Sequence, residues 1–215
     1  MTLTVNQLAK RSGITYLLLV PLGILGIIYV PTNLIVLNDI EQTIQNITVH
    51  SMLFKSSILS ALTSQLLNII LVILLYNLFK HVNKTTAHLM VIFSLLAAPI
   101  AFLNEINHLA IISLINNETI NQELISLFLD LHQYGIIIAQ IFWGLWLFPL
   151  GYLIYKSDML PRFIGVLLII GCFGYVIDSI TLILLPNLGI TFSEFTFLGE
   201  VIFPLWLLIK GIKKP

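Results

Sequence analysis

Six ionisable side chains that can bind cations or transfer protons lie within, or at the edges of, long apolar segments of this chain. They are four carboxylates and two histidines: Glu105, Asp130, Asp178, Glu200, His108 and His132. An ionisable group in hydrocarbon costs several kcal/mol, so such residues usually face a bundle interior or water. These residue types therefore predict the binding of a cation or proton, or metal-assisted chemistry.

The segments that must position these groups are membrane-spanning helices. The chain is 58% hydrophobic and only 9% charged, whereas a soluble domain carries about 25% charged residues. A hydrocarbon core of about 30 Å needs about 20 helical residues. We predict an all-α, polytopic protein in which residues 1–215 form one antiparallel bundle of six transmembrane helices. The predicted spans are 14–36, 52–79, 86–115, 133–155, 161–185 and 196–212.

Basic residues are sorted to alternate ends of these spans. Lys55 is the one exception among the ten. The nine that follow this pattern are Lys10, Arg11, Lys80, Lys84, Lys156, Arg162, Lys210, Lys213 and Lys214. Short cytoplasmic loops collect Lys and Arg, so both termini are predicted to be cytoplasmic, in a bacterial inner membrane. The apolar run 14–36 is longer than the core of a signal peptide, about 7–15 residues, so we expect it to remain as the first span.

Charge and cysteine content restrict the partners. The formal net charge is zero, which argues against nucleic acid, because a basic face would be expected for that partner. Cys172 is the one cysteine, so neither an intrachain disulfide nor a cysteine-based metal motif can form. The expected partners are the lipid bilayer and a small-molecule or ion ligand, and homo-oligomerisation is left open.

Two loops opposite the basic ends carry helix-start signals. Asp39 followed by Gln42, and Thr119 followed by Gln122, have capping-box spacing, and each pair precedes apolar residues on one helical face. We predict two short amphipathic helices on the outer membrane surface, either as connectors or as a lid.

The depths of the polar residues predict where a cavity would lie. A rise of 1.5 Å per residue, counted from the basic residue at each inner edge, places Glu200 about 15 Å up and Asp178 about 24 Å up. Gln65 and Gln140 lie at about 22–24 Å, Glu105 at about 31 Å, and His108, His132 and Lys55 at about 36 Å. The inner half is almost free of charge. This profile predicts a polar cavity that is open to the outside and sealed below, with these groups converging in it.

Local spacing suggests how individual residues act. Glu105 and His108 share a helical face, and Asp178 lies on a stripe of small residues suited to helix packing. Pro204 follows Glu200 by four positions and removes a hydrogen bond to its carbonyl, so a kink is expected there. The tryptophans Trp143, Trp146 and Trp206 are expected to pack and anchor the bundle.

Four stretches carry a resemblance to a known family: Leu75–Thr85, Phe142–Tyr155 with Ser157, Leu160–Gly174 running into Tyr175 and Asp178, and Leu198–Gly211. Asp39 and Lys55 match as well. In these stretches the chain resembles a bacterial domain-of-unknown-function family of small six-helix integral membrane proteins. The resemblance covers nearly the whole chain. It implies the fold and carries no known chemistry.

Three function classes remain open at this point. The leading hypothesis is a protein that binds or moves a small cation, a proton or a cationic molecule. Its deep site would be Glu200 and Asp178, with Glu105, Gln140 and Lys55 as further candidates. The second is an intramembrane enzyme with a divalent metal as cofactor, whose candidate ligands are His108, His132 and Asp130 or Glu105 near the mouth. The third is a structural or sensory membrane subunit.

Overall fold

The chain is almost entirely helical in the computed structural model, which describes residues 4–117 and 120–213. In chain order the elements are α1 (Val5–Gly23), the π-helix η1 (Ile24–Tyr29), α2 (Val30–Leu34), α3 (Ile40–Val49), α4 (Ser51–Phe79), α5 (Lys84–Ile115), α6 (Gln122–Leu145), α7 (Leu147–Ser157), α8 (Arg162–Leu184), the 3-10 helix η2 (Pro186–Leu188), α9 (Ser193–Thr196) and α10 (Leu198–Ile209). These described residues contain no strand, in agreement with the all-α prediction.

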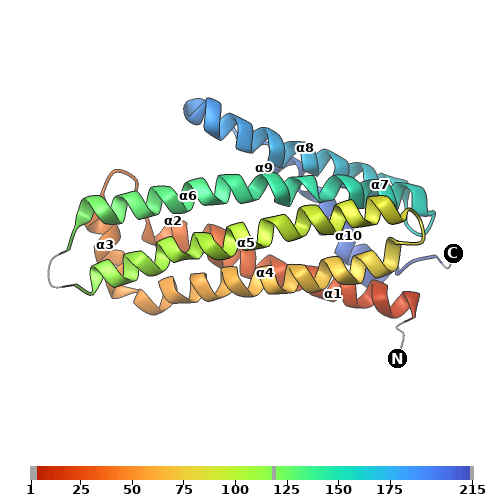
Figure 1. The fold of residues 1–215 in the computed structure, drawn as a ribbon, viewed down its shortest axis with the longest axis horizontal. Coiled ribbons are helices and arrows are strands. Elements are labelled where there is room, and N and C mark those ends of the chain that lie inside the picture. The colour runs from red at the N-terminus through yellow and green to blue at the C-terminus, as the bar shows by residue number, and fades with distance from the viewer. Residues whose placement is uncertain (1–3, 118–119, 214–215) are drawn as a thin grey trace.

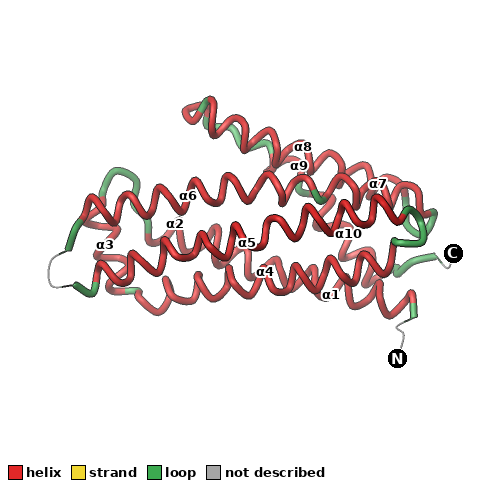
Figure 2. The backbone as a smooth tube through the Cα atoms, viewed as in Figure 1, coloured by secondary structure: helices red, strands yellow, loops and turns green. Residues whose placement is uncertain are grey.

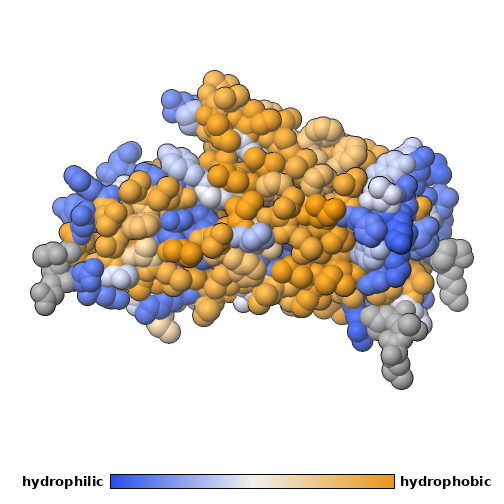
Figure 3. Space-filling model, in the orientation of Figure 1, coloured by the Kyte–Doolittle hydropathy of each residue, from blue (hydrophilic) through white to orange (hydrophobic). Residues whose placement is uncertain are grey.

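Five helical segments of the described chain are long and apolar enough to cross a membrane: Val5–Leu34, Ser51–Phe79, Lys84–Ile115, Gln122–Ser157 and Arg162–Leu184. Figure 3 shows an apolar belt around the middle of the molecule with hydrophilic residues at both ends of the long axis. Many large apolar side chains in these helices are half exposed or more, as expected for surfaces that contact lipid. The protein is therefore a multi-pass membrane protein.

The long helices lie side by side, and the start of α1 and the end of α10 lie at the same end of the bundle (Figure 1). Figure 2 shows that most loops lie at the two ends of the bundle. Helix α8 splays away from α6 towards its C-terminal end (Figure 1). The most extensive interhelical contacts are made by α5 with α6, α1 with α4, and α7 with α8.

Capping side chains explain where several helices begin. The Asp39 carboxylate accepts a hydrogen bond from the backbone N–H of Gln42 at 2.9 Å, so the predicted start of a short helix at residue 39 is confirmed. The prediction of a second short surface helix is wrong. Asn121 caps Leu124, and α6 then continues unbroken to Leu145, because its apolar residues keep helical spacing without a break. Thr119, the other residue of that signal, lies outside the described residues.

Prolines explain where helices change geometry. Pro21 has no N–H, so one intrahelical bond is missing just before the chain widens into the π-helix η1. Pro149 likewise cannot donate to the carbonyl of Leu145, which is the last residue of α6. The predicted span 133–155 is therefore two helices, α6 and α7, joined at Trp146.

The last apolar segment differs from the other five. After α8 the chain passes through η2 and turns back along α8 before α9 and α10 begin (Figure 1). Helix α10 has 12 residues, which corresponds to about 18 Å. This length is less than a bilayer core, so the predicted span 196–212 contains a short helix that starts within the bundle.

Two apolar cores lie along the long axis. One contains Leu71, Leu75 and Phe79 of α4 with α5, α7, α8 and α10, and the other contains Phe54 and Ile58 of α4 with α2, α3, α5 and α6. The stretch of α4 between these cores carries polar residues, namely Ser64, Gln65 and Asn68. A cavity borders these polar residues, between the two cores.

Candidate functional site

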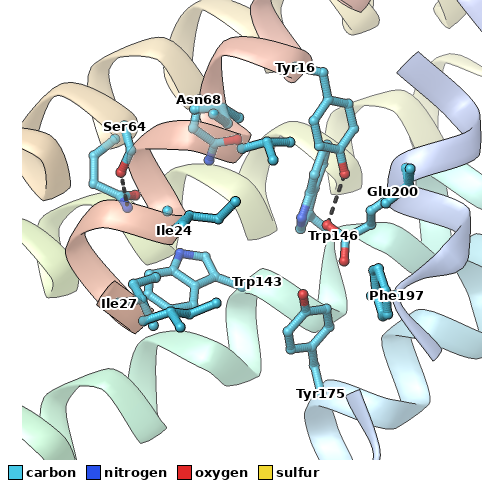
Figure 4. A pocket seen from close by; sticks show the side chains of 16 residues that line it. Tyr16, Ile24, Ile27, Ser64, Asn68, Trp143, Trp146, Tyr175, Phe197 and Glu200 are labelled. Carbon is cyan, nitrogen blue, oxygen red and sulfur yellow. Dashed lines mark hydrogen bonds between the residues drawn. The ribbon is translucent and has the colours of Figure 1, made fainter. Parts of the chain in front are cut away.

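A cavity of about 490 Å³ lies in the middle of the bundle (Figure 4). Its wall is mostly apolar and aromatic, with a few polar groups: Tyr16, Leu19, Val20, Gly23, Ile24, Ile27, Ile28, Ser64, Gln65, Asn68, Trp143, Trp146, Tyr175, Phe197, Glu200 and Val201. The prediction of a polar cavity is wrong for this one, because α1 and η1 contribute an apolar wall. Its volume is that of a pocket for a drug-sized molecule.

Glu200 supplies the one carboxylate among the described residues that line this cavity. Its Oε2 accepts a hydrogen bond from the Tyr16 hydroxyl at 2.9 Å. Its Oε1 is buried and has no hydrogen-bond partner among the described residues. In Figure 4 the Tyr175 hydroxyl points towards the same carboxylate from the other side of the cavity. No Lys, Arg or His in the described ranges forms an ion pair with Glu200.

Small residues let the helices approach closely enough to build this arrangement. A Cβ atom at Gly13 would lie 3.0 Å from the carbonyl oxygen of Pro204, so the glycine allows α10 to approach α1. Tyr16 lies one turn after Gly13 and therefore reaches Glu200. On the other side, a Cβ atom at Gly199 would lie 2.8 Å from the backbone of α8.

Gln65 adds a second unpartnered acceptor to the wall. Its Oε1 is buried without a partner in the part of the chain that the structure describes, while its Nε2 donates to Ser64 at 3.4 Å. Buried acceptors of this kind are rare, because leaving one unsatisfied costs about 1–3 kcal/mol. The cavity wall therefore carries two buried acceptors without partners among the described residues, Gln65 Oε1 and Glu200 Oε1, which favours a ligand that donates hydrogen bonds.

Asp178 does not line the cavity. Its two oxygens accept hydrogen bonds from the backbone N–H groups of Phe192 and Ser193, at 2.6 and 2.8 Å. The carboxylate thus anchors the start of α9 on the small-residue face of α8, where a Cβ atom at Gly174 would overlap Thr196. Asp178 therefore positions the segment that leads into α10. Of the two acids predicted for the deep site, only Glu200 lines the cavity.

A second group of ionisable residues joins α5 to α6. Glu105 and His108 come from α5 and His132 from α6, and one ligand atom of each lies within 4.8 Å of the others. His108 Nδ1 lies 3.2 Å from Glu105 Oε2, and His132 Nε2 lies 3.3 Å from Glu105 Oε1. The two imidazole rings stack with centroids 3.5 Å apart. This is the one group in the described ranges with a metal-ligating composition.

The remaining predicted residues lie apart from both groups. Lys55 is exposed and lines a separate cavity of about 120 Å³. Asp130 is exposed on α6, and Gln140 is half-buried there. The expected convergence on a single site is therefore wrong: Glu105, Asp130, Asp178 and Glu200 lie in four different places, because each helix presents its polar residues to different surroundings.

Sequence reasoning missed the aromatic wall. Trp143 and Trp146 were expected only to pack, and Tyr16 was not singled out, yet all three line the cavity. The available signal was the pairing of Trp143 and Trp146 at i, i+3 around Gly144, just before a proline-interrupted helix. That spacing indicates a shared face and does not identify its neighbour.

A model of the family described as "Domain of unknown function (DUF4386)" matches residues 12–211. An uncharacterized protein of Archaeoglobus fulgidus is 42% identical to this chain over 81 residues, which are 37% of this chain and 49% of that protein. The chain thus spans about half the length of the curated relative that it matches. No solved structure matches the chain.

Proposed function

The chain belongs to the family of domains of unknown function DUF4386, and we propose that it binds a small organic cation in the Glu200 cavity. The observation that carries this proposal is the buried carboxylate of Glu200, whose Oε1 has no partner in the described chain. A protonated amine or guanidinium group supplies both the charge and the donor that this oxygen lacks.

The aromatic wall supports a cation over a neutral donor. Tyr16, Trp143, Trp146, Tyr175 and Phe197 surround the space next to Glu200. The faces of such rings attract a cation by about 0.5–2 kcal/mol each when they are desolvated. The rest of the wall is aliphatic, so the ligand has a compact apolar body behind its charged group.

The ligand enters from the side of the bundle. The wall formed by Ile24, Ile27 and Ile28 belongs to the π-helix, and these side chains are 50–56% exposed. Their exposed faces contact lipid, so an apolar cation dissolved in the bilayer has a direct route to the cavity. Movement of the cation across the membrane is the further step of this proposal.

The proposed topology has six membrane segments in one domain that comprises residues 1–215. Helices α9 and α10 form the sixth segment together with the returning chain after α8. Both termini lie on the cytoplasmic side of an inner membrane in this topology, because the terminal segments and the short connections at that end together carry nine of the ten basic residues.

A fluorescent amine tests the binding site directly. Purified protein in detergent is titrated with a dansyl alkylamine, and energy transfer from Trp143 and Trp146 reports occupancy of the cavity. A neutral dansyl alcohol of the same length is the matched ligand. We expect Glu200→Gln to weaken amine binding by about 10–100-fold, because a hydrogen bond to a charged group contributes about 1.5–3 kcal/mol, and to leave alcohol binding within about twofold.

The matched control is Glu194→Gln, which removes an exposed carboxylate from α9. Equal affinity of the wild-type protein for the amine and the alcohol would contradict the proposal. If proteoliposomes take up the amine in a Glu200-dependent way, the protein moves the cation. Uptake of protons without amine binding would instead favour the proton hypothesis.

A further inference from the structure

Three side chains at the α5–α6 contact have the composition and the spacing of a metal site. We infer that Glu105, His108 and His132 bind one divalent transition-metal ion of the Zn²⁺ class. The two protein segments contribute a carboxylate oxygen and two imidazole nitrogens, which is a common ligand set for Zn²⁺. These residues are separate from the cavity of Glu200, so this inference is independent of the proposed function.

The distances fit a metal between the three groups. Ligand atoms that lie 2.0–2.1 Å from a tetrahedral ion are separated from one another by about 3.3 Å. The separations between Glu105 and the two histidines are 3.2 and 3.3 Å. The two nitrogens face different oxygens of this carboxylate, and the rings are stacked, so binding one shared ion requires the rings to turn away from their parallel arrangement.

Hydrogen bonds within the group do not satisfy it. Glu105 and His108 are 5% and 4% exposed. His108 faces Glu105 through Nδ1, and its Nε2 atom, which is not the proposed ligand atom, is buried with no partner among the described residues. No Lys or Arg in those ranges forms an ion pair with Glu105. A divalent ion bound between these three side chains would place positive charge next to the buried carboxylate.

Neighbouring side chains hold the ligands in place. The amide of Asn104 donates to the backbone carbonyl of His132 at 2.9 Å, which fixes α6 relative to α5. A methyl group at Gly135 would overlap Asn104, so this glycine makes the contact possible. The Phe54 ring lies 4.9 Å from the His108 ring. Such supporting residues are typical of metal centres.

The ligand count suggests the kind of centre. Three protein ligands leave a coordination position open for water, as in catalytic zinc sites, whereas structural sites usually have four protein ligands. Asp130 lies two residues before His132 but is exposed, so it is left out of the ligand set.

Metal binding by the whole protein tests the inference. Protein in detergent is stripped with EDTA, dialysed, and titrated with Zn²⁺ against a chelating dye. We expect one ion per chain. Glu105→Gln and His132→Asn should each weaken binding by at least about tenfold, and Asn104→Ala by about 10–100-fold through the position of His132. The matched controls are Asp130→Asn and His50→Asn, which change exposed residues of the same types and should retain the ion.

Cobalt gives a measurement that needs no variant. Co²⁺ bound to the wild-type protein should show the strong visible absorption of a low-coordinate ion with nitrogen and oxygen ligands. A spectrum of hydrated Co²⁺ alone, or no Zn²⁺ binding, overturns the inference. Retention of the ion by Glu105→Gln or His132→Asn overturns it too. Loss of the ion in the two control variants would assign binding to surface chelation and overturn it as well.

Discussion

The hydroxyl of Tyr16 donates a hydrogen bond to Glu200 Oε2 at 2.9 Å, across 184 positions of sequence. This bond joins the first helix of the chain to the last one at the edge of the central cavity. It satisfies one carboxylate oxygen, while the other is buried with no partner among the described residues. The Tyr16 hydroxyl therefore holds Glu200 in one orientation, and Oε1 is the oxygen with which a donor on the proposed ligand would pair.

Replacement of Tyr16 by Phe should lower stability. The change removes the donor and leaves Oε2 buried without a partner, which costs about 1–3 kcal/mol. Unfolding of the variant by denaturant in detergent measures the loss. Tyr134→Phe, at an exposed position, is the control. In the background of Glu200→Gln the effect of Tyr16→Phe should shrink, and equal effects in both backgrounds would show that the two residues are not coupled.

Replacement of Gly23 by Leu should block the cavity without harming the fold. A Cβ atom at Gly23 meets nothing within 4 Å, so the added side chain extends into free space of the cavity. Both the dansyl amine and the dansyl alcohol should then bind at least about tenfold more weakly, because the leucine side chain occupies cavity volume that either ligand needs. Gly165→Ala is the opposite case, since its methyl group would overlap the backbone of α7 and should destabilise the protein by about 1–3 kcal/mol. Undiminished binding by Gly23→Leu would place the ligand elsewhere.

Replacement of Asp178 by Ala should loosen the last two helices. Two backbone N–H groups at the start of α9 lose their acceptor, which we expect to cost about 2–6 kcal/mol, since each buried donor left unpaired costs about 1–3 kcal/mol. Hydrogen exchange at residues 192–197 should accelerate. Asp178→Asn retains one acceptor oxygen and should lie between the wild-type protein and the alanine variant. Unchanged exchange in Asp178→Ala would contradict the anchoring role.

Cysteine labelling tests the proposed orientation. In a background where Cys172 is replaced by Ala, single cysteines at positions 45 and 120 should react with a membrane-impermeant reagent in intact cells. A cysteine at position 83 should react only after the cells are opened, because its loop carries Lys80 and Lys84. External reaction at position 83 without reaction at position 45 would reverse the orientation.

The two groups of ionisable residues should act independently. Glu200→Gln should lose the dansyl amine and keep its Zn²⁺, whereas His132→Asn should lose Zn²⁺ and keep the amine, because no residue is shared between the cavity wall and the metal group. Zinc titration and energy transfer are measured on the same preparations. Loss of zinc in Glu200→Gln would place that carboxylate in the metal site and favour the enzyme hypothesis for the cavity.

Several features of this protein follow from its sequence alone. Long apolar segments with few charges require helices in a membrane, because every backbone polar group must be satisfied within its own segment there. The cap at Asp39 and the shared face of Glu105 and His108 are local, since their partners lie three residues away. Local hydrogen bonds and helical periodicity are sufficient to predict such features.

Only the tertiary structure determines which polar groups meet. Periodicity assigns a residue to a face, but it does not identify the helix that covers this face. Depth counting further assumes straight, complete spans, whereas the chain after α8 turns back and α10 starts inside the bundle. This return brings Asp178 to α9 and Glu200 to Tyr16. The separation of one expected site into a cavity and a metal group therefore depends on helix packing, and close approaches at Gly13 and Gly199 decide that packing.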